Sequence, residues 1–313
     1  MRTLLLVLSL AATTVLANTP ASLQKPAAAV AKPQTAPILA ATHAGARIIG
    51  VGDHGVVLLS DDEGKTFRQA RSVPTQAVLT GVSFADAAQG WAVGHDGVII
   101  HSADGGETWS LQCEDVDGDK PLFSVRFADA QHGIAVGLFN TALRTDDGGK
   151  TWTRFELKPG AAEDKHLYFI FGEGSALYIA AEAGMVYRSH DGGASWDETQ
   201  TKNIGSFWTG AVLKDGSVLV AGQRGHVFLS HDQGANWTET PSGTEQSLTA
   251  VAQKPDGGLE LTGLAGTTLE SADGGKTFSN HARPDRMPLT ALILAKDGSP
   301  VVFGGNGVVT STP

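Results

Sequence analysis

Ser102–Trp109 reads SADGGETW, and this eight-residue pattern, Ser/Thr-x-Asp-x-Gly-x-(Thr/Ser/Asn)-aromatic, occurs six times in the 313-residue chain. Its central aspartates are Asp62, Asp104, Asp147, Asp191, Asp232 and Asp273, which are 42, 43, 44, 41 and 41 residues apart. A fixed period in this range is typical of propeller blades or another stacked array. The repeat therefore predicts one extended domain built from equivalent units.

Each repeat also has landmarks upstream of its aspartate. The residue seven positions earlier suits a backbone with positive φ, since it is Gly55, Gly97, Asn140, Gly184, Gly225 or Gly266. Each unit opens with a short apolar segment: 79–84, 122–127, 167–171, 207–213, 248–251 and 289–294. Four short strands joined by glycine-rich turns fit between these landmarks, as a propeller blade requires. We expect an all-β fold of four-stranded antiparallel blades.

The spacing also gives the number of blades. Another 41 residues after Asp273 would place an aspartate at 314, and Gly304 and Gly307 stand where that unit should have its glycines. We expect a seven-bladed β-propeller whose last blade has three strands of its own. Because an open ring leaves exposed sheet edges, a segment around Ala27–Ala31 is expected to close it beside Val308–Ser311. Six blades with a ragged end are the alternative.

The N-terminus has the features of an export signal. Residues 1–17 contain one arginine, an apolar run from Leu4 to Leu16, and Ala17 at a plausible cleavage point. We expect a signal peptide over 1–17, with an uncleaved anchor as the alternative. Residues 18–37 are rich in Ala and Pro and form a linker or the closing strand, and 38–313 form the propeller. The expected location is the periplasm, or the thylakoid lumen in a photosynthetic host.

Charge and cysteine content narrow the classes of partner. The formal net charge is −10 and the pI is about 5.4, which is unlike the basic surface of a nucleic-acid binder. Cys113 is the single cysteine and has no partner for an internal disulfide. We expect a monomer that does not bind nucleic acid.

The eight-residue pattern resembles the Asp-box, or bacterial neuraminidase repeat. In such a turn the carboxylate accepts backbone N–H groups of its own loop. Six repeated copies imply a repeated structural role, so the six aspartates are expected to be structural rather than catalytic. The aromatic that ends each box is expected to lie between neighbouring sheets.

Longer phrases are similar to the photosystem II stability and assembly factor family. Gly81–Asp86 (GVSFAD) is followed by Gly90–Gly97 (GWAVGHDG), and Val125–Asp129 (VRFAD) is followed by Gly133–Gly137 (GIAVG). The resemblance implies an exported, non-catalytic propeller that acts as a chaperone-like platform for a membrane protein. It also implies that a basic patch contacts the partner, and Arg126, Arg144, Arg188 and Arg224 are the candidates.

The alternative is a glycan-binding or sialidase-like glycosidase propeller. Sialidases use three arginines, a Tyr–Glu pair and an acid–base Asp. The only tyrosines here are Tyr168, Tyr178 and Tyr187, and no partner glutamate follows from the pattern, although Tyr168 could face the channel. Arg47-Ile48-Ile49 is a superficial echo of the sialidase Arg-Ile-Pro segment. We expect no enzymatic activity and no cofactor.

Glu114–Asp119 has alternating carboxylates that resemble the start of a calcium-binding loop. Lys120 replaces the glycine of an EF-hand loop and Arg126 stands in place of its closing glutamate, so a solvated acidic loop is the preferred interpretation. Histidine spacing does not match a zinc motif. We expect no metal site.

Partner contacts are expected at the turns between second and third strands, near the central channel. Leu138 and Phe139 are apolar at such a turn, and His54 and His95 occupy two others. The alternative for both histidines and arginines is that they are ordinary exposed side chains.

Overall fold

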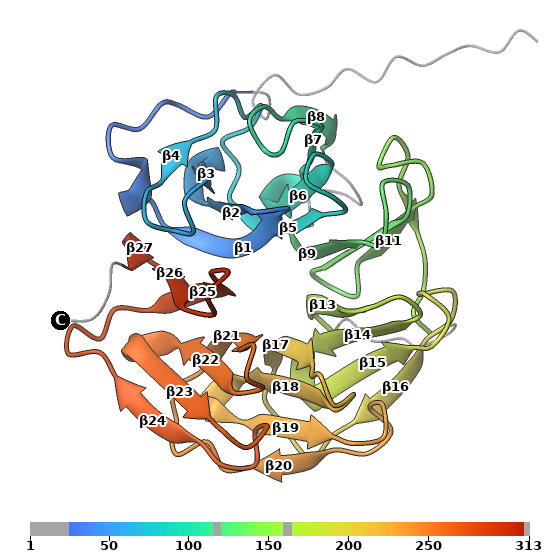
Figure 1. The fold of residues 1–313 in the computed structure, drawn as a ribbon. Coiled ribbons are helices and arrows are strands. Elements are labelled where there is room, and N and C mark those ends of the chain that lie inside the picture. The colour runs from blue at the N-terminus through green and yellow to red at the C-terminus, as the bar shows by residue number, and fades with distance from the viewer. Residues whose placement is uncertain (1–24, 115–119, 159–164, 310–313) are drawn as a thin grey trace, which may run out of the picture.

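The structure is a computed structural model that describes residues 25–114, 120–158 and 165–309. Within these ranges the chain forms seven antiparallel sheets arranged in a ring (Figure 1). Six sheets have four strands in chain order, and the seventh has three. The predicted seven-bladed all-β propeller is therefore confirmed, and the six-bladed alternative is wrong.

The bounds of the strands follow the repeat. Blades one to three comprise β1 (Ile38–Ala44), β2 (Arg47–Gly52), β3 (Val57–Ser60), β4 (Arg68–Gln69), β5 (Leu79–Phe84), β6 (Gly90–Gly94), β7 (Ile99–Ser102), β8 (Ser110–Cys113), β9 (Leu122–Phe127), β10 (Gly133–Gly137), β11 (Ala142–Thr145) and β12 (Thr153–Arg154). Blades four to seven comprise β13 (Leu167–Glu173), β14 (Ala176–Ala181), β15 (Met185–Ser189), β16 (Asp197–Gln200), β17 (Phe207–Val212), β18 (Val218–Gly222), β19 (Val227–Ser230), β20 (Thr238–Thr240), β21 (Leu248–Gln253), β22 (Leu259–Gly263), β23 (Thr267–Ser271), β24 (Ser279–Ala282), β25 (Leu289–Leu294), β26 (Pro300–Gly304) and β27 (Gly307–Val309). The first strand of each blade lies innermost in the ring (Figure 1).

Short 3-10 turns join the second and third strands of five blades. They are η2 (Asp53–Gly55), η3 (His95–Gly97), η4 (Glu182–Gly184), η5 (Gln223–Gly225) and η6 (Leu264–Gly266). In blade three the corresponding turn places Phe139 and Asn140 at φ 51° and 55°. The prediction that Asn140 substitutes for a glycine with positive φ is confirmed.

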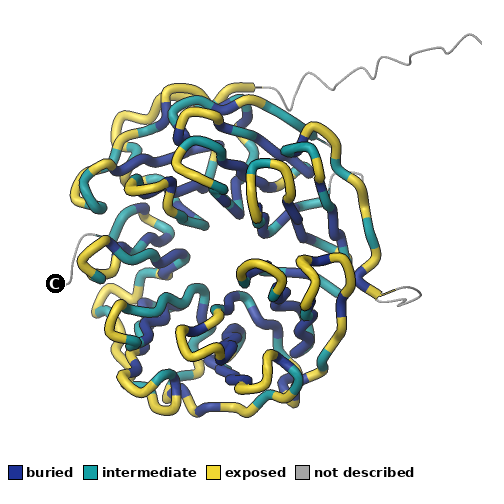
Figure 2. The backbone as a smooth tube through the Cα atoms, turned by 45° about the vertical axis from the view of Figure 1, so that its right-hand side comes forward, coloured by how far each residue is buried: buried dark blue, intermediate teal, exposed yellow. Residues whose placement is uncertain are grey.

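Burial follows from stacking sheet against sheet. β6 is buried along its whole length because neighbouring blades cover both its faces, whereas β5, at the channel, alternates buried and half-buried residues. Figure 2 shows buried strands inside the ring and exposed turns at its margins. Box aromatics pack as predicted: Trp109 is buried in one cluster with Ile49 and Leu59 of the preceding blade.

Hydroxyl groups tie some neighbouring blades together at the channel. Thr80 Oγ1 donates to the carbonyl of Leu122 at 2.6 Å, and Thr249 Oγ1 donates to the carbonyl of Leu289 at 2.8 Å. Thr290 Oγ1 makes the same bond to the carbonyl of Ile38, across the junction between the last blade and the first. The ring therefore closes with the same contact that links blades elsewhere.

The predicted closing strand is wrong in its pairing. The N–H of Ala27 donates to the carbonyl of Val73 at 2.9 Å, so this segment lies along blade one rather than beside β27. The short 3-10 turn η1 (Pro33–Thr35) lies against β27 instead, and Pro33 has no N–H with which to extend a sheet. The part of the prediction that falls on residues 310 and 311 lies outside the described residues.

Candidate functional site

The two ends of the ring carry different structures. Because strands in each blade are antiparallel, the turn between second and third strands lies at the end where the first strand begins, as the pairing of Leu79 with Gly94 shows. We call this end the tip face. The Asp-boxes follow the third strands and lie at the opposite end, which we call the box face.

On the box face the aspartates are engaged by their own turns. Asp104 accepts bonds from Ser102 Oγ at 2.9 Å, from Thr108 N at 2.9 Å and from Thr108 Oγ1 at 2.6 Å. Equivalent bonds from Thr66, Thr151 and Asn236 hold the pKa values of Asp62, Asp147 and Asp232 at about 2. These carboxylates stay ionised and occupied by the loops that they order.

Two of the four candidate arginines share a groove. Arg126 of β9 and Arg144 of β11 line a cavity of about 330 Å³ between blades three and four, together with Asp129, His132 and Asp146. Burial lowers the pKa of Arg126, opposed by the charge of Glu173, and its buried Nε has no hydrogen-bond partner. Arg126 is therefore a largely desolvated cation.

Arg144 is partly committed to packing. Its guanidinium lies over the ring of Phe155, 4.6 Å from the centroid, and its NH2 group donates to the carbonyl of Gly193 at 3.4 Å. Arg144 thus reaches the box of the next blade. It is less available to a ligand than a solvated arginine.

The other two arginines lie elsewhere. Arg188 of β15 lies 3.8 Å from the carboxylate of Asp197, and it is not among the residues that line the groove of Arg126 and Arg144. Arg224 is in η5 on the tip face, where its N–H donates to Ser247 Oγ at 3.2 Å. The structure therefore brings together Arg126 and Arg144 and places Arg224 at the opposite end of the ring.

The predicted turn residues lie on the tip face. His54 has a side chain 79% exposed and lies 2.8 Å from Asp53, and His95 is also exposed. Leu138 is half-buried, whereas Phe139 is 46% exposed. Phe139 contacts His166 edge-to-face, with 5.0 Å between ring centroids.

Sequence reasoning missed an aromatic row at the mouth of the channel. The second residue of the first strand is Phe123, Tyr168 and Trp208 in blades three, four and five, and all three line the central cavity of about 330 Å³. Phe123 and Tyr168 are stacked with centroids 5.6 Å apart. The prediction that Tyr168 faces the channel is confirmed. Comparing this position across the repeats would have found the row, since blades two, six and seven have threonine there.

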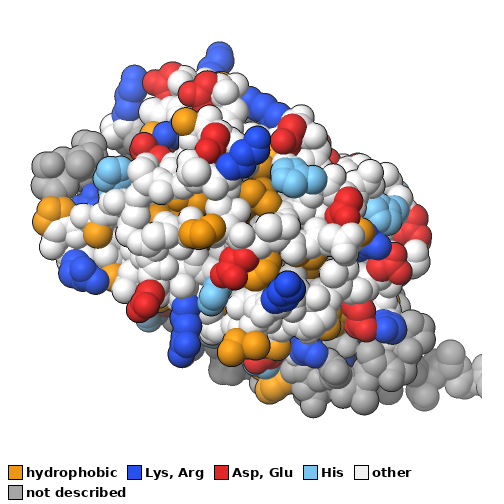
Figure 3. All heavy atoms as spheres, turned by 90° about the horizontal axis from the view of Figure 1, so that it is seen from below, with side chains coloured by type: hydrophobic (Ala, Val, Ile, Leu, Met, Phe, Trp, Pro, Cys, Tyr) orange, Lys and Arg blue, Asp and Glu red, His pale blue; other side chains and the backbone are white. Residues whose placement is uncertain are grey.

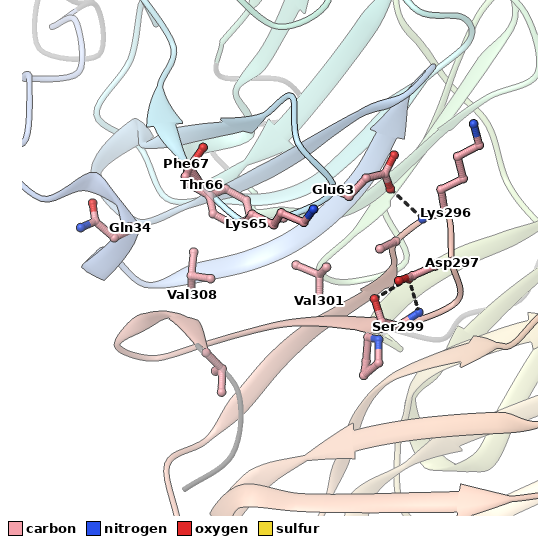
Figure 4. Close-up of a pocket in the computed structure, with 14 residues that line it drawn as sticks. Gln34, Glu63, Lys65, Thr66, Phe67, Lys296, Asp297, Ser299, Val301 and Val308 are labelled. Atoms are coloured by element: carbon pink, nitrogen blue, oxygen red, sulfur yellow. Dashed lines mark hydrogen bonds between the residues drawn. The ribbon is translucent and has the colours of Figure 1, made fainter.

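A third hollow lies beside the three-stranded blade. This groove of about 800 Å³ is lined by the box of blade one and by β26 and β27 (Figure 4). Glu63 reaches across it and accepts the N–H of Lys296 at 2.6 Å, while Asp297 accepts from Ser299. Lys65 and Lys296 balance these acids, so its charge favours neither anion nor cation. Figure 3, which views the molecule from below Figure 1, likewise shows acidic and basic side chains interspersed on the surface.

No group of three or more His, Cys, Asp and Glu side chains in 25–114, 120–158 and 165–309 is arranged to hold a metal ion. The acidic segment Glu114–Asp119 falls outside these ranges after its first residue. No helix in the described part of the chain is long and apolar enough to cross a membrane.

Solved structures share this fold at low identity. One described as YCF48 bound to D1 peptide has a TM-score of 0.72 at 19% identity, over 88% of this chain and 93% of that one. A GH74 xyloglucanase from Xanthomonas campestris has a TM-score of 0.69 at 16% identity, over 91% of this chain and 52% of that one. The fold is thus found both in a peptide-binding protein and in a glycosidase.

Two curated relatives with higher sequence identity are both described as photosystem II assembly proteins. The chain is 38% identical over 161 residues to the photosystem II stability/assembly factor HCF136, chloroplastic, of Cyanidioschyzon merolae, which covers 47% of this chain and 37% of that protein. It is 39% identical over 137 residues to the photosystem II assembly protein Ycf48 of Thermosynechococcus vestitus, covering 44% and 39% respectively. The matches therefore span less than two fifths of the length of these curated relatives. A model of the family described as photosynthesis system II assembly factor YCF48 matches residues 69–310, and the chain belongs to that family.

Proposed function

We propose that this chain is an exported, non-catalytic scaffold that binds a segment of a membrane protein during assembly of a photosystem II-type complex. The observation that carries this is the family match over residues 69–310. A solved relative of the same fold is described as bound to a D1 peptide, so a segment of the D1 chain is the partner we infer. The apolar run in residues 1–17 supports export to the thylakoid lumen or periplasm.

The state of the tyrosines supports a non-catalytic role. Tyr178 and Tyr187 are buried, and burial raises the pKa of Tyr187 to about 12. Burial also raises the pKa of Tyr168, against a hydrogen bond with Ser206. A tyrosine nucleophile needs an adjacent base and access to substrate, and the two buried tyrosines lack that access.

Partner contacts are proposed on both faces. On the box face, Arg126 and Arg144 offer their shared groove to a carboxylate, with Arg188 on the next blade. On the tip face the proposed contacts are Arg224, Leu138, Phe139, His54 and His95. Charged contacts of this kind steer association and select the partner more than they add affinity.

The test is in-cell crosslinking of the tagged mature protein, followed by mass spectrometry of what it retains. We expect a specific membrane-protein subunit, retained less when Arg126 and Arg144 are both changed to Ala. Lys276→Ala, an exposed cation in the box of blade six, is the matched control. Retention of abundant bystanders alone would contradict the proposal, and retention of glycan-bearing material would favour the sugar-binding alternative.

A further inference from the structure

The tip face of blades three to five has unusually exposed apolar side chains. Among the described residues, large apolar side chains are exposed at Val30, Phe139, Ile204 and Val212. Ile204 is 91% exposed, in the connection from blade four to blade five, and Phe139 is 46% exposed on blade three. A single exposed apolar side chain is ordinary, so these two matter only if further apolar or aromatic side chains lie with them on the same face.

The loop that carries Ile204 is held firmly in place. Gln200 Nε2 donates to the carbonyl of Ala183 in η4 at 2.7 Å, and Thr201 Oγ1 donates to the carbonyl of Gly184 at 2.8 Å. Asn203 bonds both the N–H and the carbonyl of Gly205, each at 3.0 Å. Ile204 is therefore presented in a fixed position, which lowers the entropic cost of binding.

Aromatic rings continue this surface from the rim into the channel. His166 is edge-on to Phe139 at 5.0 Å and lies 6.0 Å from Tyr168, which stacks on Phe123. Trp208 occupies the position equivalent to Tyr168 in the next blade. We call Phe123, Phe139, His166, Tyr168, Ile204 and Trp208 the rim cluster.

Two polar groups of the rim cluster residue His166 already have partners. Nδ1 of His166 accepts the N–H of Phe139 at 3.3 Å, and the N–H of His166 donates to Glu182 at 3.1 Å. A sugar needs free donors and acceptors for its hydroxyls, whereas apolar side chains of a polypeptide need area and aromatic faces. Phe139 and Ile204 supply exposed apolar area of the second kind.

We propose that the rim cluster is the docking surface for apolar and aromatic side chains of the bound D1 segment, with Ile204 and Phe139 as its outer anchors. This rests on the proposed function and locates the apolar part of that interaction on the face opposite the arginine groove. The solved relative described with a D1 peptide is the reason for choosing a peptide as the occupant. A few buried apolar and aromatic anchors provide most of the affinity of such interfaces.

The experiment uses overlapping synthetic peptides that cover the D1 chain, with affinities measured by fluorescence anisotropy on the full mature protein. The test variant combines Ile204→Ser with Phe139→Asn, since Asn tolerates the positive φ of position 139. Val212→Ser, at the opposite end of β17, is the control that also removes an exposed apolar side chain. Unchanged urea midpoints verify that all variants fold.

We expect the double variant to bind the best D1 peptide at least about tenfold more weakly, and the control to stay within about twofold. Equal affinity of the double variant and the wild type would overturn the rim cluster and leave the proposed function intact. An equal loss of peptide affinity in Val212→Ser would also overturn the rim cluster. If the wild type binds no D1 peptide, the proposed function fails and this inference fails with it. Loss of binding to xyloglucan oligosaccharides, with peptide binding kept, would identify a glycan surface instead.

Discussion

Two groups of blades differ at the second residue of the inner strand, although their sheets stack in the same way. One group is blades two, six and seven, and the other is blades three to five. In blades two, six and seven Thr80, Thr249 and Thr290 donate a hydroxyl to the next blade's backbone. In blades three to five the same position holds an aromatic ring that lines the channel. The aromatic blades thus lack at this position the inter-blade hydrogen bond that the threonine blades make.

The box face shows no such division, since all six boxes share the bonds from the Ser/Thr hydroxyl to the aspartate and from the residue four positions later to the same carboxylate. We expect acid to destabilise both halves of the ring together, and this is the largest effect. The pKa values of Asp62, Asp147 and Asp232 are about 2 in the fold, below about 4 for an unfolded aspartate. Their contribution is therefore complete above pH 4 and is lost as pH falls from about 4 to about 2.

The measurement is the urea midpoint at pH 7, 5, 4 and 3. A constant midpoint down to pH 5 and a steep fall below pH 4 is the expected result. Asp147→Asn should shallow the fall. A midpoint that drops between pH 7 and 5 would show that histidines, rather than the boxes, control stability.

Substituting the serine of a single box tests whether the boxes in the two halves of the ring contribute equally to stability. Ser102 and Ser189 are buried, and each Oγ accepts a glycine N–H at 2.8 Å and donates to the box aspartate. Changing either to Ala leaves that buried N–H unpaired, at a cost of about 1–3 kcal/mol. Urea unfolding of the two variants should give equal losses. Unequal losses would show that boxes in the two halves are not interchangeable.

The inter-blade hydrogen bonds of Thr80, Thr249 and Thr290 should have a smaller effect, and only on stability. Thr249→Val removes the bond to the carbonyl of Leu289 and should lower the free energy of unfolding by about 0.5–1.5 kcal/mol. Peptide affinity should stay at the wild-type value. A loss of affinity in this variant would mean that the threonine half also contacts the partner.

The smallest effect on stability, and the sharpest test of the comparison, is Tyr168→Thr. It gives blade four the residue that three other blades carry, so we expect a stability change below about 1 kcal/mol. Peptide binding should weaken several-fold because the stacked face offered with Phe123 is lost. Affinity and urea midpoint, measured on one preparation, separate the two effects. Wild-type affinity would remove Tyr168 from the rim cluster.

The sequence alone predicted the blades, because the boxes and their glycines make local turns whose hydrogen bonds lie within eight residues. Asn140 is an example, since the need for positive φ is visible without any tertiary contact. The structural use of the box aspartates was expected on the same ground. The sequence also showed the family resemblance, in the segments that begin at Gly81 and Val125.

The tertiary structure decided the features that depend on contacts between segments far apart in the sequence. Pairing of Ala27 with Val73 rather than with β27 depends on which part of the ring lies beside the segment in the folded molecule, and no local pattern encodes that. Arg126 and Arg144 lie in one groove while Arg224 lies at the other end of the ring, because strand direction, not chain distance, assigns residues to faces. Phe123, Tyr168 and Trp208 are about 40 residues apart in sequence and form one surface because the ring places equivalent positions side by side. The local hydrogen bonds of the repeat specified the propeller scaffold. Closure of the ring then placed residues that depart from the repeat, such as Phe123, Tyr168 and Trp208, beside one another.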